Sequence, residues 1–280
     1  GAAFRSASPL PLVYAFLLNF VGYVLSVSRW RLLLAAQGVH ASRLALTRSH
    51  MVAIFFNNLL PSTIGGDAMR IYDSWKLGAS RTAAVAVIAM DRLTGLVALL
   101  LCAVAALLVS GFLTGNISWT LAGAFLLAAA VAVGIAALAH SAGRIAKVSM
   151  RLRLNYRLRA TIQRFGSAFQ AFSSKPGTIA GAFTFSVLLQ INVIAFYALI
   201  ASAFHLGVPF FAFFLIIPPA LAVMLLPISV NAIGIRENAF VYRLGLYGVV
   251  AADAVAFAWA AFGIVLVHGV MGGVVYALRR

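Results

Sequence analysis

The sequence predicts an all-α, polytopic helical membrane protein with two inverted repeats, each containing a re-entrant, broken-helix element. A soluble domain is excluded by composition, because 64% of the 280 residues are hydrophobic and only 9% are charged. Several apolar runs are long enough to cross the roughly 30 Å hydrocarbon core of a bilayer. Two polar stretches, around Pro61 and Pro227, interrupt the apolar sequence with the same order of features: Leu-Leu-Pro, then small and polar residues, then glycine and charge.

The first transmembrane span is predicted between Leu10 and Val27, and the sequence Arg29-Trp30-Arg31 follows it. Aromatic and basic residues are enriched at membrane–water interfaces, so we expect this tripeptide to anchor the end of the helix there. A basic connection comes next and is expected to remain on the same side of the membrane.

The stretch after this connection does not fit a transmembrane helix. The apolar run before Pro61 is too short to span the bilayer, and Pro61 with Gly65-Gly66 breaks a helix that continues. Non-helical backbone at membrane depth is tolerated only where protein or a water-filled cavity satisfies its polar groups. The pattern therefore predicts a re-entrant segment that lines a cavity, followed by a short helix at 69–76 that Asp67 caps.

The middle of the chain is predicted to cross the membrane twice, at 81–109 and at 119–139, with an uncharged link at 110–118 between the spans. The following segment, 144–175, alternates basic and apolar residues. This pattern is typical of amphipathic helices that lie on an anionic membrane face, and we expect it to bind anionic lipid headgroups. Nucleic acid is not expected as a partner, although the net charge is +16.

The second half repeats the plan of the first. A span is predicted at 178–203, and the run 208–227 leads into the second re-entrant element, bent by Pro218-Pro219. The last span is predicted at 254–278. One domain, residues 1–280, is thus expected.

The distribution of basic residues predicts the topology. With the basic connections on the cytoplasmic side, most Lys and Arg residues lie inside and the uncharged link lies outside. The first re-entrant element then enters from the cytoplasm and the second from outside, so repeats 10–109 and 178–278, joined by 110–177, are inverted. In secondary transporters two such broken elements meet near the midplane and form the substrate site.

Only five acidic residues are present, and ionisable groups inside a membrane are costly enough to be functional candidates. Asp91-Arg92 lies ten residues into its predicted helix, ~15 Å deep. Adjacent helical residues point in different directions, so this pair needs other partners. We expect those partners among Asn57, Arg70, Arg236 and Glu237. Two alternatives are a structural ion-pair network, and helix capping for the acidic residues Asp67 and Glu237.

Gly65-Gly66 precedes a helix start and offers N–H groups to an anion such as phosphate, and Arg70 and Arg236 strengthen that interpretation. The five histidines are scattered without ligand spacing, so neither a metal nor another cofactor is predicted. No catalytic residue is assigned. The residues predicted to bind substrate are Asn57, Asn58, Ser62, Gly65, Gly66, Asp67, Arg70, Asp91, Arg92, Ser229, Asn231, Gly234, Arg236 and Glu237.

Three motifs together resemble the lysylphosphatidylglycerol synthase transmembrane-domain family of flippase-like integral membrane proteins. They are Asn58-Leu59-Leu60-Pro61-Ser62-Thr63-Ile64-Gly65-Gly66-Asp67-Ala68-Met69-Arg70, Asp91-Arg92-Leu93-Thr94-Gly95, and Pro227-Ile228-Ser229 with Gly234-Ile235-Arg236-Glu237. The resemblance implies lipid translocation across the bacterial cytoplasmic (inner) membrane, or the archaeal plasma membrane. It also implies one more span before the Arg-Trp-Arg helix. The soluble synthase domain of full-length members is not in this sequence, so transport rather than synthesis is expected.

The expected function is therefore a lipid transporter, or flippase, for an anionic or zwitterionic phospholipid or a polyprenyl-phosphate lipid. A separate lipid-modifying enzyme is an expected partner. Two alternatives remain open. One is a membrane enzyme or accessory subunit of lipid-linked sugar or aminoacyl-lipid synthesis, with Asp67 or Asp91 as base. The other is a structural scaffold for a partner enzyme.

Overall fold

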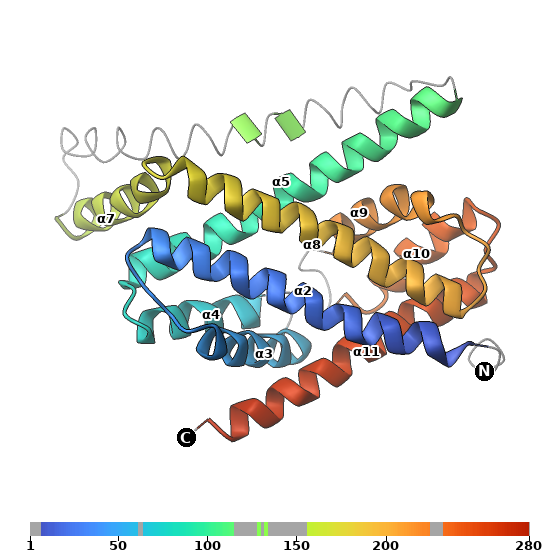
Figure 1. Cartoon of the computed structure of the whole chain (residues 1–280), viewed down its shortest axis with the longest axis horizontal. Helices are drawn as coiled ribbons and strands as arrows, with labels where there is room; N and C mark the ends of the chain where they lie inside the picture. The colour runs from blue at the N-terminus through green and yellow to red at the C-terminus, as the bar shows by residue number, and fades with distance from the viewer. Residues whose placement is uncertain are drawn as a thin grey trace.

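The computed structural model describes residues 7–60, 64–114, 128–129, 132–133, 156–224 and 232–279, and within these ranges every regular element is a helix (Figure 1). The all-α prediction is thus confirmed. The elements are α2 (Pro9–Ala36), α3 (Arg43–Leu59), α4 (Ile64–Lys76), α5 (Arg81–Thr114), α7 (Tyr156–Ser173), α8 (Pro176–Ala203), the 3₁₀ helix η1 (Phe210–Ala212), α9 (Phe213–Met224), α10 (Ile235–Gly245) and α11 (Ala251–Ala277).

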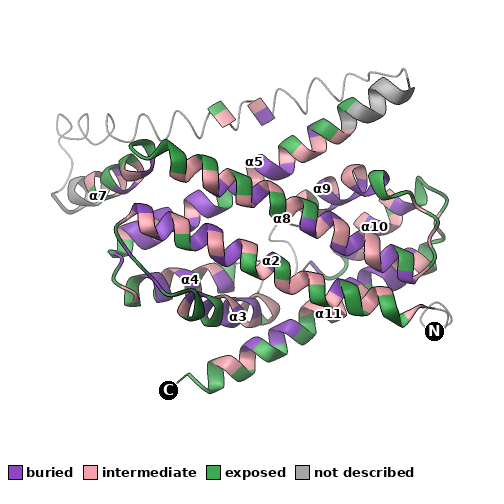
Figure 2. Cartoon of the chain, viewed as in Figure 1, coloured by how far each residue is buried: buried purple, intermediate pink, exposed green. Residues whose placement is uncertain are grey.

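Among the described residues, four helices are long and apolar enough to cross a bilayer: α2, α5, α8 and α11. At 1.5 Å per residue, a helix of 27 or 28 residues is ~40 Å long and exceeds the ~30 Å hydrocarbon core. Exposed residues recur along the outer faces of these helices (Figure 2). On α2 the exposed large apolar side chains follow a helical period, as expected of a lipid-facing stripe; they are Leu10, Val13, Tyr14, Leu17, Val21 and Val24.

Helices α3 and α4 form an antiparallel hairpin. Near its tip the Gly66 N–H donates to the Asn57 side-chain oxygen at 2.7 Å. At its open end Ala45 and Lys76 line the same cavity. The predicted helix break is present, because α3 ends at Leu59 and α4 begins at Ile64, but Gly65 and Gly66 do not form it, since both lie in the first turn of α4. Glycine is needed at position 66 because α3 approaches closely: a Cβ there would lie only 2.6 Å from the Ala53 carbonyl oxygen.

A second antiparallel hairpin consists of α9 and α10. Arg243 of α10 donates to the Leu215 carbonyl oxygen of α9 at 3.2 Å, and at the other end Val223 and Gly234 line one cavity. Pro218 and Pro219 lie inside α9, as expected of a distorted helix. Both predicted broken elements therefore correspond to pairs of short helices, although 61–63 and 225–231 lie outside the described residues.

The first spans of the two halves, α2 and α8, pack side by side and run antiparallel. The Ser8 N–H donates to the Ala203 carbonyl oxygen at 2.9 Å, and at the opposite end Lys175 donates to the Ala36 carbonyl oxygen at 3.0 Å. Other contacts also occur in matching pairs: α3 packs on α11 and α9 on α5, while α4 packs on α5 and α10 on α11. An internal two-fold relation would give this pattern, and the inverted repeats stay a prediction.

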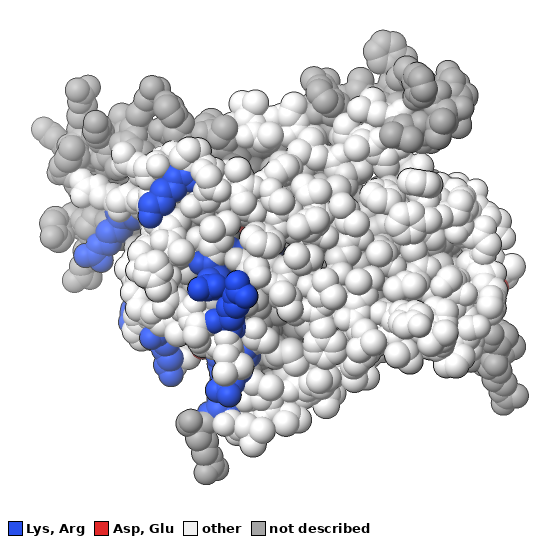
Figure 3. Space-filling model, viewed as in Figure 1, with Lys and Arg blue, Asp and Glu red and all other residues white. Residues whose placement is uncertain are grey.

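Basic side chains gather at one end of the molecule, where α2, α4 and α11 end and α3, α5 and α8 begin (Figure 3). Arg279, beyond the end of α11, forms a 2.8 Å ion pair with Asp73 of α4. Gln37, beyond the end of α2, donates to the Ala168 carbonyl oxygen of α7 at 2.7 Å. The grouping follows the predicted basic side, although most of the predicted link and span at 110–139, and residues 144–155, lie outside the described residues.

Candidate functional site

The centre of the site is a buried carboxylate held by two arginines. Asp91 of α5 is 1% exposed, and its oxygens accept hydrogen bonds from Arg29 Nε of α2 at 2.6 Å and Arg70 Nη1 of α4 at 2.9 Å. Arg29 also donates to the Ser186 hydroxyl of α8 at 2.8 Å. The Arg70 guanidinium lies 4.6 Å from the centre of the Trp30 ring. Hydrogen bonds therefore link α2, α4, α5 and α8 through the Asp91 carboxylate and the Arg29 guanidinium.

A second ion pair lies beside the first and is more exposed. Arg92 of α5 donates from Nε and Nη2 to the two oxygens of Asp67 of α4, at 2.8 and 2.7 Å. The side chains are 41% and 21% exposed. Asp91 and Arg92 thus take different partners, as predicted for adjacent helical residues. Arg70, which pairs with Asp91, is one of the predicted partners. Asp67, which pairs with Arg92, lies on the same hairpin as Arg70 and is outside the predicted set.

Between these groups lies a cavity of about 340 Å³. Its lining comes from α2, α3, α5, α8, α9, α10 and the turn before α10. The lining residues are Arg29, Asn57, Asp91, Arg92, Gly95, Leu96, Leu99, Leu189, Gln190, Leu221, Met224, Ala232 and Arg236. The described lining contains three arginines and one carboxylate, Arg92 is paired with Asp67 beside the lining, and most of the remaining wall is apolar. We call this space the arginine cavity.

Arg236 enters the cavity from the second hairpin. It is 7% exposed, and its guanidinium lies 4.6 Å from the centre of the Phe262 ring of α11. The neighbouring Glu237 has a different task, because its carboxylate accepts from the Gly234 N–H at 2.7 Å and caps α10. The capping alternative therefore describes Glu237, whereas Asp67 is engaged by Arg92.

Comparison with known families decides what kind of protein carries this site. The sequence model of the family described as the lysylphosphatidylglycerol synthase TM region matches residues 1–273. The chain belongs to this family. Its membership and the four long apolar helices of the described part of the chain make it an integral membrane protein, of a family linked to membrane lipid metabolism or transport. Comparison with curated proteins and with solved structures gave no match.

Not every predicted site residue of this family member lines the arginine cavity. Asn57, Asp91, Arg92 and Arg236 do, and Asp67 and Arg70 reach it through their ion pairs. Asn58 instead donates to the Val265 carbonyl oxygen of α11 at 3.3 Å, Gly65 and Gly66 pack on α3, and Gly234 lines another cavity. The Gly66 amide, predicted to hold phosphate, is engaged by Asn57 in this structure. Ser62, Ser229 and Asn231 lie outside the described residues.

The prediction that Arg29-Trp30-Arg31 anchors a helix end at the interface is wrong for its first two residues. Arg29 is 6% exposed and Trp30 is fully buried, because α2 continues to Ala36. The apolar run 32–36 was the signal for this longer helix. Sequence reasoning therefore missed Arg29 and its partner Ser186, as well as Gln190, which lines the cavity.

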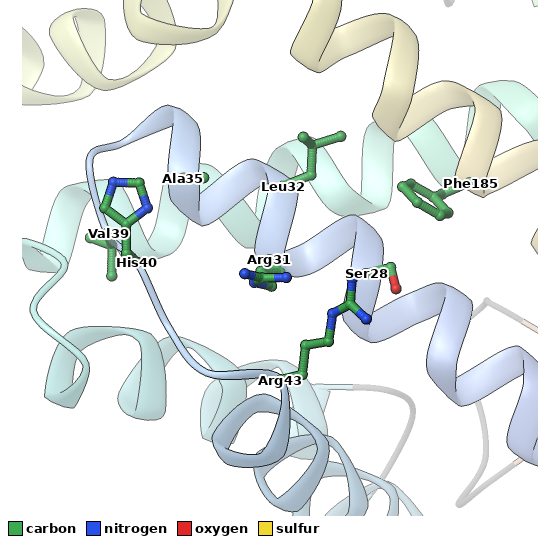
Figure 4. A pocket seen from close by; sticks show the side chains of 8 residues that line it. All are labelled: Ser28, Arg31, Leu32, Ala35, Val39, His40, Arg43 and Phe185. Atoms are coloured by element: carbon green, nitrogen blue, oxygen red, sulfur yellow. The ribbon is translucent and has the colours of Figure 1, made fainter.

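A separate basic groove of about 270 Å³ lies at the basic end. Arg31, His40 and Arg43 line it together with Phe185 of α8, and both arginines extend into the space between α2 and the start of α3 (Figure 4). Among the described residues of its lining none is acidic. Within the described ranges, no group of three His, Cys, Asp or Glu residues is arranged to hold a metal ion.

Proposed function

We propose that this family member is a lipid flippase, which moves the phosphate-bearing headgroup of a membrane lipid through the arginine cavity. The observation that carries the proposal is the charge around that cavity: Arg29 and Arg70 share a single carboxylate, Asp91, inside a bundle of membrane-spanning helices, and Arg92 and Arg236 also line the space. Two buried guanidinium groups that share one counter-charge are costly in a membrane, so an anionic ligand stabilises this arrangement.

Guanidinium groups are well suited to phosphate, because their planar N–H donors match its oxygens in pairs. Arg70 also has hydrogen-bond donors that such a ligand could use. It donates from Nη1 to Asp91, while its buried Nε and Nη2 atoms have no hydrogen-bond partner among the described residues. Asp67 and Asp91 are the counter-ions when no phosphate is present, and they can exchange arginine donors with an arriving headgroup.

The rest of the cavity suits the remainder of a lipid. Leu96 and Leu99 of α5, Leu189 of α8, and Leu221 and Met224 of α9 supply an apolar wall. Acyl or polyprenyl chains can therefore remain in hydrocarbon while the headgroup crosses. Both hairpins contribute to the polar part, Asn57 from the first and Arg236 from the second, which is the arrangement in which two broken elements alternate access to one site.

The proposal covers anionic and zwitterionic phospholipids and polyprenyl-phosphate lipids, since all carry the phosphate that the arginines recognise. It places the protein in the bacterial cytoplasmic membrane, or the archaeal equivalent, with its basic end toward the cytoplasm. The role is transport rather than catalysis, with lipid synthesis left to a separate enzyme.

The test is translocation of a headgroup-labelled fluorescent phosphatidylglycerol in proteoliposomes, followed with a membrane-impermeant quencher. The wild-type protein should accelerate exchange between leaflets. Loss of a hydrogen bond to a charged group costs about 1.5–3 kcal/mol, so Arg92→Gln and Arg236→Gln should slow translocation about 10- to 100-fold. Arg81→Gln is the matched control, because Arg81 is an exposed arginine of the same helix as Arg92, outside the cavity, and should retain the wild-type rate.

Acceleration that persists in both cavity variants would show that lipid crosses elsewhere. No acceleration of any phosphate-bearing lipid would contradict the proposed function itself and favour an accessory role in lipid synthesis.

A further inference from the structure

The basic groove at the end of α2 lies apart from the arginine cavity and shares no lining residue with it. It occupies about 270 Å³, and the side chains of Arg31 and Arg43 extend into it from two different helices (Figure 4). His40 lies at the same place, in the connection between those helices. The other lining residues are one serine and four apolar residues: Ser28, Leu32, Ala35, Val39 and Phe185.

The groove lies on the lipid-facing side of α2. The exposed apolar stripe of this helix ends with Val21 and Val24. Ser28, Arg31 and Ala35 of the groove continue the same spacing of three and four residues, which places them on the same helix face. A ligand therefore reaches the groove from the lipid around the bundle.

The depth of the groove matches the boundary between headgroups and acyl chains. Helix α2 has 28 residues and is ~42 Å long, close to the ~40–45 Å of a bilayer with its headgroups. His40 and Arg43 lie beyond its end, at headgroup level, whereas Ser28 lies ~12 Å before that end. The groove thus extends from the headgroup layer into the first part of the hydrocarbon. A lipid covers both its basic and its apolar walls, which a free phosphate ion does not.

The chain supplies no side-chain carboxylate to balance the arginines of the groove. All five acidic residues belong to the described part of the sequence. Glu237 caps α10, and Asp253 lies in the first turn of α11, at the opposite end of the molecule. The remaining three pair with arginines outside the groove: Asp67, Asp73 and Asp91. An anionic ligand can therefore supply the missing counter-charge of Arg31 and Arg43.

The same charge balance determines which headgroups fit. Guanidinium groups donate to phosphate oxygens in pairs, so both arginines suit a phosphodiester. The groove has no acidic lining residue to accept the ammonium group of a zwitterionic headgroup, in contrast to the arginine cavity, which contains Asp91. A headgroup with a net negative charge is thus favoured in the groove.

We propose that the basic groove binds the headgroup phosphate of an anionic phospholipid in the leaflet at the basic end of the molecule. This site is separate from the arginine cavity, and binding there does not depend on lipid translocation. One bound phosphate joins Arg31 of α2 to Arg43 of α3, and so fastens the first hairpin to the first span.

The test measures which lipids lie beside the groove in a bilayer. A fluorophore is attached to Val24→Cys in a Cys102→Ser background, because Val24 is 63% exposed and lies one turn from Ser28 on the same face. The protein is reconstituted in phosphatidylcholine vesicles with phosphatidylglycerol or phosphatidylcholine that carries a nitroxide quencher in its upper acyl chain. We expect phosphatidylglycerol to quench more strongly at equal mole fraction. Arg31→Gln and Arg43→Gln should each reduce this preference about 5-fold.

Arg81→Gln is the matched control, because Arg81 is an exposed arginine at the basic end that does not line the groove. This variant should keep the wild-type preference. Equal quenching by the two lipids in the wild-type protein overturns the proposal. A loss of preference as large in Arg81→Gln as in Arg31→Gln also overturns it, since the attraction is then a diffuse property of the basic end. Loss of the preference on addition of millimolar inorganic phosphate identifies a free-phosphate site and overturns the assignment to lipid.

Discussion

At the scale of single residues, the two ion networks of the site differ in how deeply they are buried. Asp91 is almost completely buried and neutralises part of the charge of both Arg29 and Arg70. Asp67 and Arg92 form a bidentate pair that remains partly open to the cavity. Removing one partner of a buried pair leaves an uncompensated charge, whereas an exposed pair contributes little.

Asp91→Asn is therefore expected to destabilise the protein by about 3–5 kcal/mol, because two guanidinium groups lose their common counter-charge. Asp67→Asn is the matched change in the exposed pair and is expected to cost about 0–1 kcal/mol. Equilibrium unfolding in mixed detergent micelles measures both free energies. Equal costs for the two substitutions would contradict the assignment of Asp91 as the structural centre of the network.

Part of this site was predictable and part was not. The rarity of acids in an apolar chain was enough to select Asp67 and Asp91, and the glycine-containing motifs selected Arg70 and Arg236. Arg29 was missed because an arginine near a predicted helix end has the same local sequence whether it lies at the interface or in the core. Only the true end of α2, at Ala36, separates the two cases.

At the scale of helices, glycine decides how closely α3 approaches α11. A Cβ added to Gly272 of α11 would overlap the Met51 carbonyl oxygen of α3, and one added to Gly269 would overlap the Asn58 side chain. Small residues permit such close packing in membrane helices. The contact orients α3, which carries Asn57 into the lining of the arginine cavity, so we expect a change here to alter that cavity.

Gly272→Ala should consequently destabilise the protein, although alanine is favoured over glycine in a helix by about 1 kcal/mol. Backbone atoms must shift to admit the methyl group, and this cost outweighs the propensity. Gly263→Ala, in the same helix with open space around its added Cβ, should be neutral or stabilising by up to about 1 kcal/mol. Thermal unfolding in detergent compares the two variants. A stabilised Gly272→Ala protein would refute the close contact.

Helix positions were predictable where apolar length alone determines them. The spans at 81–109, 178–203 and 254–278 correspond to α5, α8 and α11 within a few residues at most boundaries. The start of α4 was not predictable in the same way, because glycines usually break helices. Here Gly65 and Gly66 remain helical because α3 occupies the space of their missing side chains.

At the scale of the whole molecule, the antiparallel pairing of α2 with α8 brings the two halves together around the arginine cavity. The pairing places the end of α2 beside the start of α8, so that basic residues of both halves share one end (Figure 3). The opposite end contains the start of α11 and the end of α8. From this asymmetry the positive-inside rule predicts an orientation with the basic end toward the cytoplasm.

Cysteine labelling tests that orientation. In a Cys102→Ser background, Lys76→Cys at the basic end should react only with reagent supplied from the cytoplasmic side. Tyr247→Cys, exposed before α11, should react only from the outside, because α11 crosses between them. Labelling of both positions from the same side would contradict the orientation of the bundle.

The central claim, that a lipid phosphate crosses through the arginine cavity, is tested most directly by photo-crosslinking. A phospholipid with a photoreactive group in its headgroup is activated in proteoliposomes, and the labelled peptides are mapped. We expect label on cavity positions of α5, α8 and α9, including Leu99, Gln190 and Leu221, and its loss when excess unlabelled phospholipid competes. Label confined to the basic surface around Arg31 and Arg43, with none in the cavity, would contradict the account.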